Sequence, residues 1–341
     1  MTFNRPQRIQ IMKELGLRLL DHNEKYLTAR EKAYYENAWF TPDNIDQSID
    51  AICNCFLQES LLTEWMKQYE EPKESKKIGL IMAGNIPLVG FHDFLTVFMS
   101  GHKAIIKLSS KDEKLFRFVL DELLSIDPKV EETFELVERL KDFDAVIATG
   151  SNNTSRYFDY YFGKYPNIIR KNRNGTGVLT GDETEEQLRT IGRDIFDYFG
   201  LGCRNITKIY VPETYEFDLL LRVLDEYKAL SMHHKYKNNY DYNYALYLLN
   251  KEKFLANENL ILREDPAYIS RISCVHYEYY KNLNDLKKRL NLDGELIQCI
   301  CTKDGQILGS ENEFAFGASQ IPALGEYADG VDTMAFLSNL K

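Results

Sequence analysis

Short apolar runs alternate with helical patterns between residues 78 and 151, and this alternation restricts the fold more than any other feature of the sequence. Runs at 78–83, 104–107 and 145–148 predict strands, patterns at 88–99 and 111–124 predict helices, and Thr149-Gly150-Ser151 opens a further helix. Strands that alternate with helices in this order join through right-handed crossovers into a parallel sheet. We therefore predict an α/β fold in which a nucleotide would bind at the carboxyl ends of the strands.

Helical and α/β patterns also flank this stretch. The first 70 residues predict helices, one of which starts where Thr41 caps and Pro42 fills the first helical position. A charged segment with a proline, at 70–77, marks a boundary. Downstream, the patterns predict helices at 184–198 and 217–227, a strand at 206–211, a surface loop with an adjoining strand in the Tyr- and Asn-rich block 236–247, and a last α/β stretch at 275–301.

Composition narrows the class of protein. The chain has 341 residues, 44% of them hydrophobic, so it can bury a large core and form two domains. Its net charge of -10 argues against nucleic acid or an anionic membrane as the main partner. The start of the chain has no secretory signal or membrane span, and the six cysteines have no paired framework. We expect a cytoplasmic protein.

Cys203 is the leading candidate for a reactive residue. It lies in Phe199-Gly200-Leu201-Gly202-Cys203-Arg204-Asn205, behind two glycines and directly before a cation. Glycine allows close approach, and a neighbouring arginine favours the thiolate that attacks carbonyl carbon. The alternative is a cysteine that fills a gap at a turn. The remaining cysteines lie in apolar helical or strand-like patterns and are interpreted as small buried hydrophobes.

Phosphate and metal motifs are missing from the sequence. Neither G-x-G-x-x-G nor G-x-x-x-x-G-K-[ST] occurs, so a dinucleotide would need to be held by other means. His233 and His234 are adjacent and cannot converge on one ion in a helix. Cys299-x-Cys301 has no second pair to complete a zinc site. We predict no metal centre.

Four stretches together resemble the aldehyde dehydrogenase superfamily, and within it the acyl-CoA reductases of the LuxC type. They read GNIPLVGFHDFLTVFMSGHKAIIKLSSKD at 84–112, AVIATGSNNTSRYF at 145–158, FGLGCRNITKIYVP at 199–212 and FGASQIPALGEYADGVDTMAFL at 316–337. The resemblance implies an aldehyde dehydrogenase-like fold, with a Rossmann-type parallel-sheet cofactor domain and an α/β catalytic domain. It divides the chain into a helical region at 1–75, a cofactor domain at 76–198, a catalytic domain at 199–318 and a tail at 319–341 that could join subunits.

The resemblance also implies an activity and roles for single residues. The activity is NAD(P)H-dependent reduction of a fatty acyl-CoA or acyl-carrier thioester to an aldehyde, with NADPH or NADH as cofactor. Cys203 would carry the acyl group, and Asn85 would stabilise the oxyanion. The cofactor would contact Lys107, Ser109, Gly150 and Ser151. Relatives of this type imply a homo-oligomer, a dimer or a tetramer.

One departure from the superfamily favours reduction over oxidation. Oxidising members carry a glutamate that activates water, whereas the corresponding stretch 168–175 reads IIRKNRNG and has no carboxylate. Its basic residues Arg170, Lys171 and Arg173 either meet phosphates or form a solvated face.

Other interpretations of these residues stay open. Asn85 could be only a turn former, Lys107 a surface lysine and Gly150-Ser151 a helix cap. As a whole, the chain could be a cysteine-dependent acyltransferase or thioesterase without nicotinamide, using His234 or His276 as base. It could also be a non-catalytic binding protein on the same fold.

Overall fold

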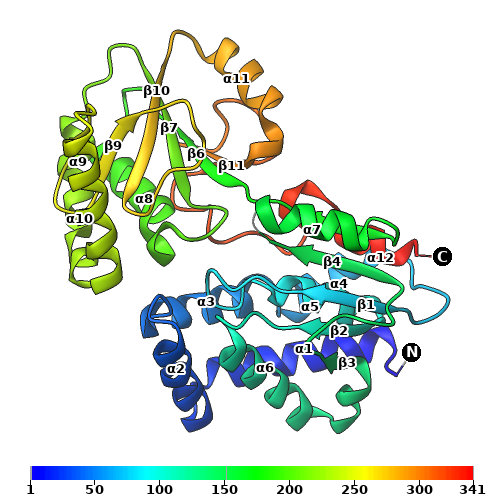
Figure 1. Cartoon of the computed structure of the whole chain (residues 1–341). Coiled ribbons are helices and arrows are strands. Elements are labelled where there is room, and N and C mark those ends of the chain that lie inside the picture. Colours follow the sequence, from blue (N-terminus) through cyan, green and yellow to red (C-terminus); the bar gives the residue numbers. More distant parts are fainter. Residues whose placement is uncertain (1, 151, 341) are drawn as a thin grey trace. The chain divides into compact units, whose positions relative to one another are not determined.

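The computed structural model describes residues 2–150 and 152–340, the side chains of residues 152 and 153 excepted. The chain divides into two compact units, the first made of residues 1–172 and 322–341 and the second of residues 173–321 (Figure 1). These boundaries differ from the segments expected from the sequence. The strand at 174–178 pairs within the second unit, and the helices before residue 75 share one core with the first sheet.

The first unit is built on a five-stranded parallel sheet. Its strands, in spatial order, are β3 (Phe134–Leu136), β2 (Lys103–Lys107), β1 (Lys77–Ile81), β4 (Ala145–Thr149) and β5 (Asn167–Arg170). The chain therefore builds outward from β1 in one direction and from β4 in the other. The predicted parallel sheet is confirmed, and its switch point lies between the carboxyl ends of β1 and β4, where open α/β sheets bind ligands.

The crossover helices of the first unit cover both faces of this sheet. Helices α5 (Phe91–Ser100) and α6 (Glu113–Ile126) lead from β1 through β2 toward β3, whereas α7 (Asn152–Phe162) leads from β4 to β5. Right-handed crossovers in opposite directions place helices on opposite faces, as Figure 1 shows for α6 and α7. Helix α5 is apolar almost all round and is buried on both sides.

Four helices precede the sheet, as the sequence predicts. They are α1 (Arg5–Leu20), α2 (Glu24–Glu36), α3 (Pro42–Cys55) and α4 (Glu59–Lys67). The Thr41 side chain accepts a hydrogen bond from the amide of Asn44, which confirms the predicted start of α3. Helices α1 and α2 pack on α6, α1 also packs on α5, and α3 and α4 pack on α1; α12 (Thr333–Ser338) returns to pack on α5.

The second unit contains a seven-stranded sheet. Its strands, in spatial order, are β12 (Glu313–Ala315), β11 (Ile297–Thr302), β6 (Asn174–Val178), β7 (Ile206–Pro212), β10 (Cys274–Tyr280), β9 (Ile261–Glu264) and β8 (Leu255–Ala256). All neighbours are parallel except β8 and β9. Its helices are α8 (Glu185–Phe196), α9 (Asp218–Leu224), α10 (His234–Leu249) and α11 (Leu283–Leu292), with α10 and α11 on opposite faces (Figure 1). Short 3-10 helices occur as η1 (Pro128–Thr133), η2 (Asp197–Gly200), η3 (Asp225–Met232), η4 (Gly294–Leu296) and η5 (Ala328–Gly330).

The expectation of a surface loop and strand at 236–247 is wrong, because this block forms helix α10. Tyr236, Tyr240 and Tyr247 recur at helical spacing and are buried on one face. The hydroxyl of Tyr236 donates to the Asn259 carbonyl at 2.8 Å, and that of Tyr240 donates to the Asn257 carbonyl. Tyrosine therefore serves here as a core residue whose polar tip is paired at the edge of the core.

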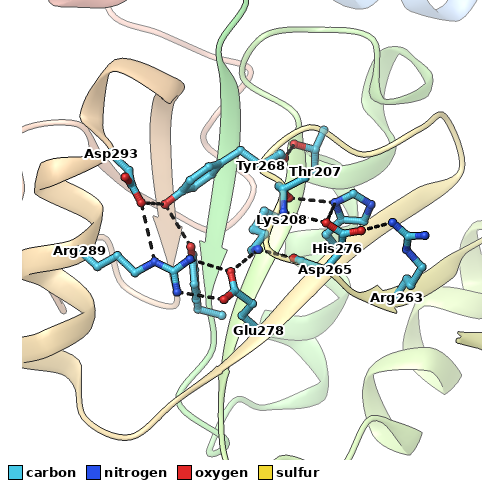
Figure 2. Close-up of polar contacts among 11 residues, drawn as sticks. Thr207, Lys208, Arg263, Asp265, Tyr268, His276, Glu278, Arg289 and Asp293 are labelled. Atoms are coloured by element: carbon cyan, nitrogen blue, oxygen red, sulfur yellow. Dashed lines mark hydrogen bonds and ion pairs between the residues drawn. The ribbon is translucent and has the colours of Figure 1, made fainter. Parts of the chain in front are cut away.

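A network of paired charges joins the strands of the second unit (Figure 2). Lys208 of β7 is fully buried, and its ammonium group pairs with the Glu278 carboxylate of β10. Arg289 of α11 contacts the same carboxylate at 2.9 and 3.0 Å. Burial opposes charge on Glu278, but the hydrogen bonds from Arg289 and Lys208 hold its pKa below the usual value. The network thus ties β7, β10 and α11 together.

Candidate functional site

Cys203 lies in a turn with an unusual backbone, between η2 and β7. The thiol-bearing residue is half-buried. Just before it, Tyr198, Phe199 and Gly200 adopt positive φ angles of 54°, 59° and 73°. Left-handed geometry costs a non-glycine residue about 1–2 kcal/mol. Strain of this kind persists only where surrounding contacts enforce it, and it is concentrated at functional sites.

The side chain of Asn205 holds this turn in shape. Its Oδ1 accepts from the Gly202 amide at 2.7 Å, and its Nδ2 donates to the carbonyls of Asp194 and Asp197 at 3.0 and 2.9 Å. Asn205 is completely buried. One side-chain amide therefore fixes the backbone on both sides of the Cys203–Arg204 pair, at Gly202 and at Asn205 itself. The sequence motif includes Asn205, but nothing in the sequence indicates this bracketing role.

Two further residues lock the turn to the rest of the second unit. A Cβ on Gly175 of β6 would lie 2.6 Å from the carbonyl oxygen of Arg204, so only glycine allows this approach. The buried carboxyl of Asp194 accepts from the Gly317 amide at 2.6 Å and from the Ser319 hydroxyl at 2.6 Å. Asp194 therefore connects the FGASQ segment, which is part of the tail resemblance, to the helix that precedes Cys203.

Arg204 and the remaining cysteines have other surroundings. The Arg204 guanidinium lies over the Phe314 ring, 5.1 Å from its centre, and donates to the Ser319 carbonyl at 3.4 Å. Burial raises the pKa of the Cys53 thiol to about 12 and that of Cys274 to about 11. These two cysteines are thus weak nucleophiles, in agreement with a packing role.

Asn85 and three of the predicted cofactor residues lie at or just after the ends of strands in the first unit. These three are Lys107, Ser109 and Gly150. The half-buried Asn85 comes after β1, Lys107 is the exposed last residue of β2, and Ser109 follows it. A Cβ on Gly84 would lie 2.4 Å from the Ser109 hydroxyl oxygen, so the loops after β1 and β2 touch at this point. The structure therefore brings Gly84, Asn85 and Ser109 to one edge of the sheet.

Gly150 lies at the same edge, directly after β4. Its amide donates to the carbonyl of Arg170 at 3.3 Å. A Cβ on Gly150 would meet Phe158 at 2.8 Å and Thr154 at 3.1 Å, so a side chain would disturb the start of α7. The predicted cofactor residue Ser151 lies outside the described residues. Cys203 belongs to the second unit, whereas Asn85 and the cofactor candidates belong to the first.

Comparisons with known proteins agree with this architecture. Residues 12–167 match the family model "Acyl-CoA reductase (LuxC)". The long-chain acyl-protein thioester reductase 2 of Photobacterium leiognathi is 21% identical over 265 residues, which are 71% of this chain and 55% of that protein. Part of the chain is therefore similar to the LuxC family, and the chain has an aldehyde dehydrogenase-like fold. It spans about half the length of the curated relative that it matches.

Solved structures support the fold of the chain. Aldehyde dehydrogenase 21 from Physcomitrella patens has a TM-score of 0.65 at 12% identity. The aligned region covers 88% of this chain and 73% of that enzyme's chain. A betaine aldehyde dehydrogenase from Staphylococcus aureus has a TM-score of 0.67 at 12% identity, with 88% and 72% covered. The predicted fold class, including the helical N-terminal region, is thereby confirmed.

The basic residues Arg170, Lys171 and Arg173 do not act together in either of the ways expected from the sequence. Arg170, the last residue of β5, is buried and pairs with the Asp93 carboxylate at 2.5 Å. It also donates to the Thr333 hydroxyl at 3.0 Å. Arg173 lies in the second unit and donates to the Gly294 carbonyl. Arg170 is therefore a structural cation, and the three residues do not form one solvated face.

Of the histidines in the second unit, His233 and His276 contact neighbouring groups, whereas His234 is exposed. The His233 ring packs at a tilt against Phe199 with 4.4 Å between ring centres, and His234 is exposed at the start of α10. His276 is buried in β10, where its Nδ1 contacts the Ala267 carbonyl at 2.9 Å. Among the described residues, histidine, cysteine and acidic side chains nowhere gather in a group of three that could hold a metal ion. Within the same residues, the structure contains no helix with the length and apolar character needed to cross a membrane.

Proposed function

We propose that this protein reduces fatty acyl thioesters to aldehydes with NADPH or NADH, and that Cys203 carries the acyl group. The observation that carries the proposal is the turn at Cys203. Its backbone is strained, and the buried side-chain amide of Asn205 holds it in shape. Of the six cysteines, Cys203 alone lies outside a regular helix or strand. The similarity to acyl-CoA reductases of the LuxC type supports the thioester as substrate class. The second unit would supply the nucleophile and the first unit the cofactor site.

The residues of the chain can perform the covalent steps. The Cys203 thiolate attacks the carbonyl carbon of the thioester, and the bond from that carbon to the carrier sulfur breaks, so that the carrier leaves as a thiol after taking up a proton. After reduction of the enzyme thioester, the tetrahedral oxyanion on Cys203 collapses, releases the aldehyde and regenerates the thiolate. The Asn85 amide and the Cys203 backbone N–H would donate to the oxyanion in both steps.

The first unit has features that fit a nicotinamide dinucleotide. Gly84, shortly after β1, and Gly150, directly after β4, stand at the switch point, where they allow the loops that end these strands to pack closely against Ser109 and the start of α7. Lys107 and Ser109 would hold the adenosine ribose side, and Gly150 and Ser151 the pyrophosphate and nicotinamide side. When bound, the cofactor supplies the hydride that reduces the enzyme thioester.

Arg170 supports reduction rather than hydrolysis. It ends β5 in the stretch where oxidising relatives carry their water-activating glutamate. The nearby Asp93 carboxylate is engaged by the Arg170 guanidinium at 2.5 Å. A carboxylate held in a charge-assisted pair is a poor general base for water. The enzyme thioester would therefore last long enough to be reduced.

The decisive experiment follows NAD(P)H absorbance while the purified protein is mixed with acyl-CoA thioesters of increasing chain length. We expect thioester-dependent consumption of the cofactor, formation of free aldehyde, and a preference for one range of chain lengths. A matched reaction with the free fatty acid in place of the thioester should show no consumption. If no acyl-CoA or acyl-carrier thioester supports consumption of either cofactor, the proposed function is wrong.

A further inference from the structure

The peptide group between Pro87 and Leu88 is held at both of its polar ends by buried side chains. The Ser48 hydroxyl of α3 donates to the Pro87 carbonyl at 2.7 Å. The Leu88 amide donates to Oδ2 of Asp112 at 2.8 Å. Ser48 and Asp112 are 6% and 5% exposed, so water does not compete for either bond. A peptide group pinned at both ends cannot rotate.

Leu88 is the residue that needs this restraint. Its φ angle is 54°, in the left-handed region that a branched apolar side chain rarely adopts. The strain persists because the surrounding contacts over-determine the conformation. Asn85 lies three residues earlier, on the same loop, and Pro87 between them fixes its own φ. Fixing the Pro87–Leu88 peptide therefore restricts the short loop that carries Asn85.

Asp112 does not cap helix α6 with its side chain, although its position predicts this role. It stands immediately before α6, where an aspartate normally caps the helix, but its side chain makes no capping hydrogen bond. Its carboxyl reaches back to Leu88, and the other oxygen, Oδ1, is buried without a hydrogen-bond partner in the described part of the chain. Because burial disfavours the charged form, the pKa of this carboxyl is raised. Within the described residues, the hydrogen bond from the Leu88 amide is therefore the one that holds this carboxyl.

We propose that Asp112 and Ser48 are positioning residues that clamp the Pro87–Leu88 peptide and thereby fix the loop that carries Asn85, the proposed oxyanion donor. The role rests on the proposed function, because it acts through Asn85. Neither residue touches the substrate. Both act on the loop after β1, which also carries Gly84 and its contact with Ser109.

Steady-state kinetics test the clamp. Loss of one oxyanion donor, in Asn85→Ala, should lower kcat by about a hundred-fold to a thousand-fold. Asp112→Ala and Ser48→Ala should each lower kcat by about ten-fold to a hundred-fold, as misplacement of a catalytic group does, with KM for the thioester and the Kd of NADPH unchanged. Asp112→Asn keeps one neutral carbonyl oxygen that can accept from the Leu88 amide and should restore most of the rate. Asp121→Ala, which removes an exposed carboxylate from the same helix, is the matched control and should leave kcat unchanged.

A double-mutant cycle separates positioning from general stability. If Asp112 acts through Asn85, adding Asp112→Ala to Asn85→Ala should change kcat by less than about two-fold. Multiplicative losses, or an effect of Asp112→Ala on thermal stability alone, would overturn the proposal.

Hydrogen exchange of the unaltered protein tests the clamp independently of catalysis and of whether the variants fold. The Leu88 amide should exchange at least about a hundred-fold more slowly than exposed loop amides, although it lies outside any helix or strand. Exchange as fast as in exposed loops would overturn the clamp. If the amide is protected but the unaltered protein reduces no thioester, the proposed function fails while the clamp stands as a structural feature.

Discussion

Cys203 and Asn205 form a pair in which one residue would react and the other holds the backbone. The thiol is half-exposed, whereas the amide beside it is completely buried and uses all of its hydrogen-bonding groups inside the turn. Reactive groups are effective when the surrounding shell fixes them. At the residue scale, the two side chains therefore give separable experimental effects, one on chemistry and one on stability.

Replacing Cys203 by alanine should abolish thioester reduction, with a loss of at least about a thousand-fold, because the variant lacks the thiol that is proposed to carry the acyl group. Intact-protein mass spectrometry after mixing with acyl-CoA, without reductant, should show one added acyl group on the unaltered protein and none on the variant. Cys55→Ala is the matched control, since Cys55 is also half-buried but belongs to α3. Acylation of Cys203→Ala at the normal rate would contradict the assignment.

Replacing Asn205 by alanine should lower the free energy of unfolding by about 3 kcal/mol, because the Gly202 amide and two carbonyls lose their buried partner. Urea denaturation measures this change. Asn284→Ala, on the exposed side of α11, should change stability by less than about 0.5 kcal/mol. Equal effects of the two variants would mean that the turn does not depend on Asn205.

At the scale of elements, the charge network between β7, β10 and α11 is asymmetric. Glu278 contacts two cations, Lys208 and Arg289, so it keeps a partner if either one is lost. Lys208 has no carboxylate other than Glu278 within ion-pair distance in the described residues. Burial therefore makes Lys208 the more vulnerable member, and its lowered pKa has the same cause.

This asymmetry predicts the order of two single variants. Glu278→Leu should destabilise the protein by about 3 kcal/mol, because it leaves the buried Lys208 ammonium unneutralised. Lys208→Met should cost less, and the double variant should be closer to Lys208→Met than to the sum. Chemical denaturation of the three proteins checks the order. Arg222→Met, which breaks an exposed pair with Glu185, is the control and should cost less than about 1 kcal/mol.

His102, which lies between α5 and β2, links Lys76 to Leu337 of the returning helix α12 through hydrogen bonds that depend on pH. Its Nδ1 accepts from the Lys76 amide at 3.1 Å, and its Nε2 contacts the Leu337 carbonyl at 3.0 Å, so the ring must be neutral to make both bonds. Burial lowers its pKa below the ordinary 6.5. The unfolded chain then binds a proton more readily than the folded one, and stability is lost as the pH falls below about 6.5.

The free energy of unfolding should therefore decrease more steeply between pH 7 and pH 5 in the unaltered protein than in His102→Gln. The glutamine amide can still donate to the Leu337 carbonyl but does not titrate. Urea denaturation at several pH values measures the two slopes. Parallel slopes would show that His102 does not control acid stability.

The sequence predicted those elements whose apolar pattern and end signals agree. The strands at β1, β2, β4 and β7 and the start of α3 at Thr41 are of this kind. Helix α10 could not be predicted by the same reasoning, because its buried face consists of tyrosines, which resemble surface residues until their hydroxyl partners are known. The Asp112 contact with Leu88 was equally hidden, since it joins residues 24 positions apart through a strained backbone.

At the scale of the whole molecule, the first unit is discontinuous and the second is continuous. Residues 322–341 contribute Met334 and Leu337, both fully buried, to the core of the first unit. Trp65 also donates to the hydroxyl of Tyr327 at 2.8 Å. The first unit therefore depends on a segment that follows the entire second unit along the chain.

This arrangement predicts different behaviour of two fragments. Residues 173–321 should fold alone, with a cooperative urea transition, because both their sheet and their core are complete. Residues 1–172 alone should unfold at a lower urea concentration than the same residues mixed with a peptide of residues 322–341. A fragment 1–172 whose stability does not change when the peptide is added would contradict this dependence.

The interrupted path of the first unit also sets an order of assembly on the ribosome. Residues 173–321 are synthesised before the segment that completes the first unit, and domains generally fold as units during synthesis. The second unit, which contains Cys203, can thus fold while the first unit still lacks residues 322–341. While residues 322–341 are still inside the ribosome, the second unit should be able to fold and the first unit should remain incomplete, so the sheet edge that is proposed to bind the cofactor would be completed last.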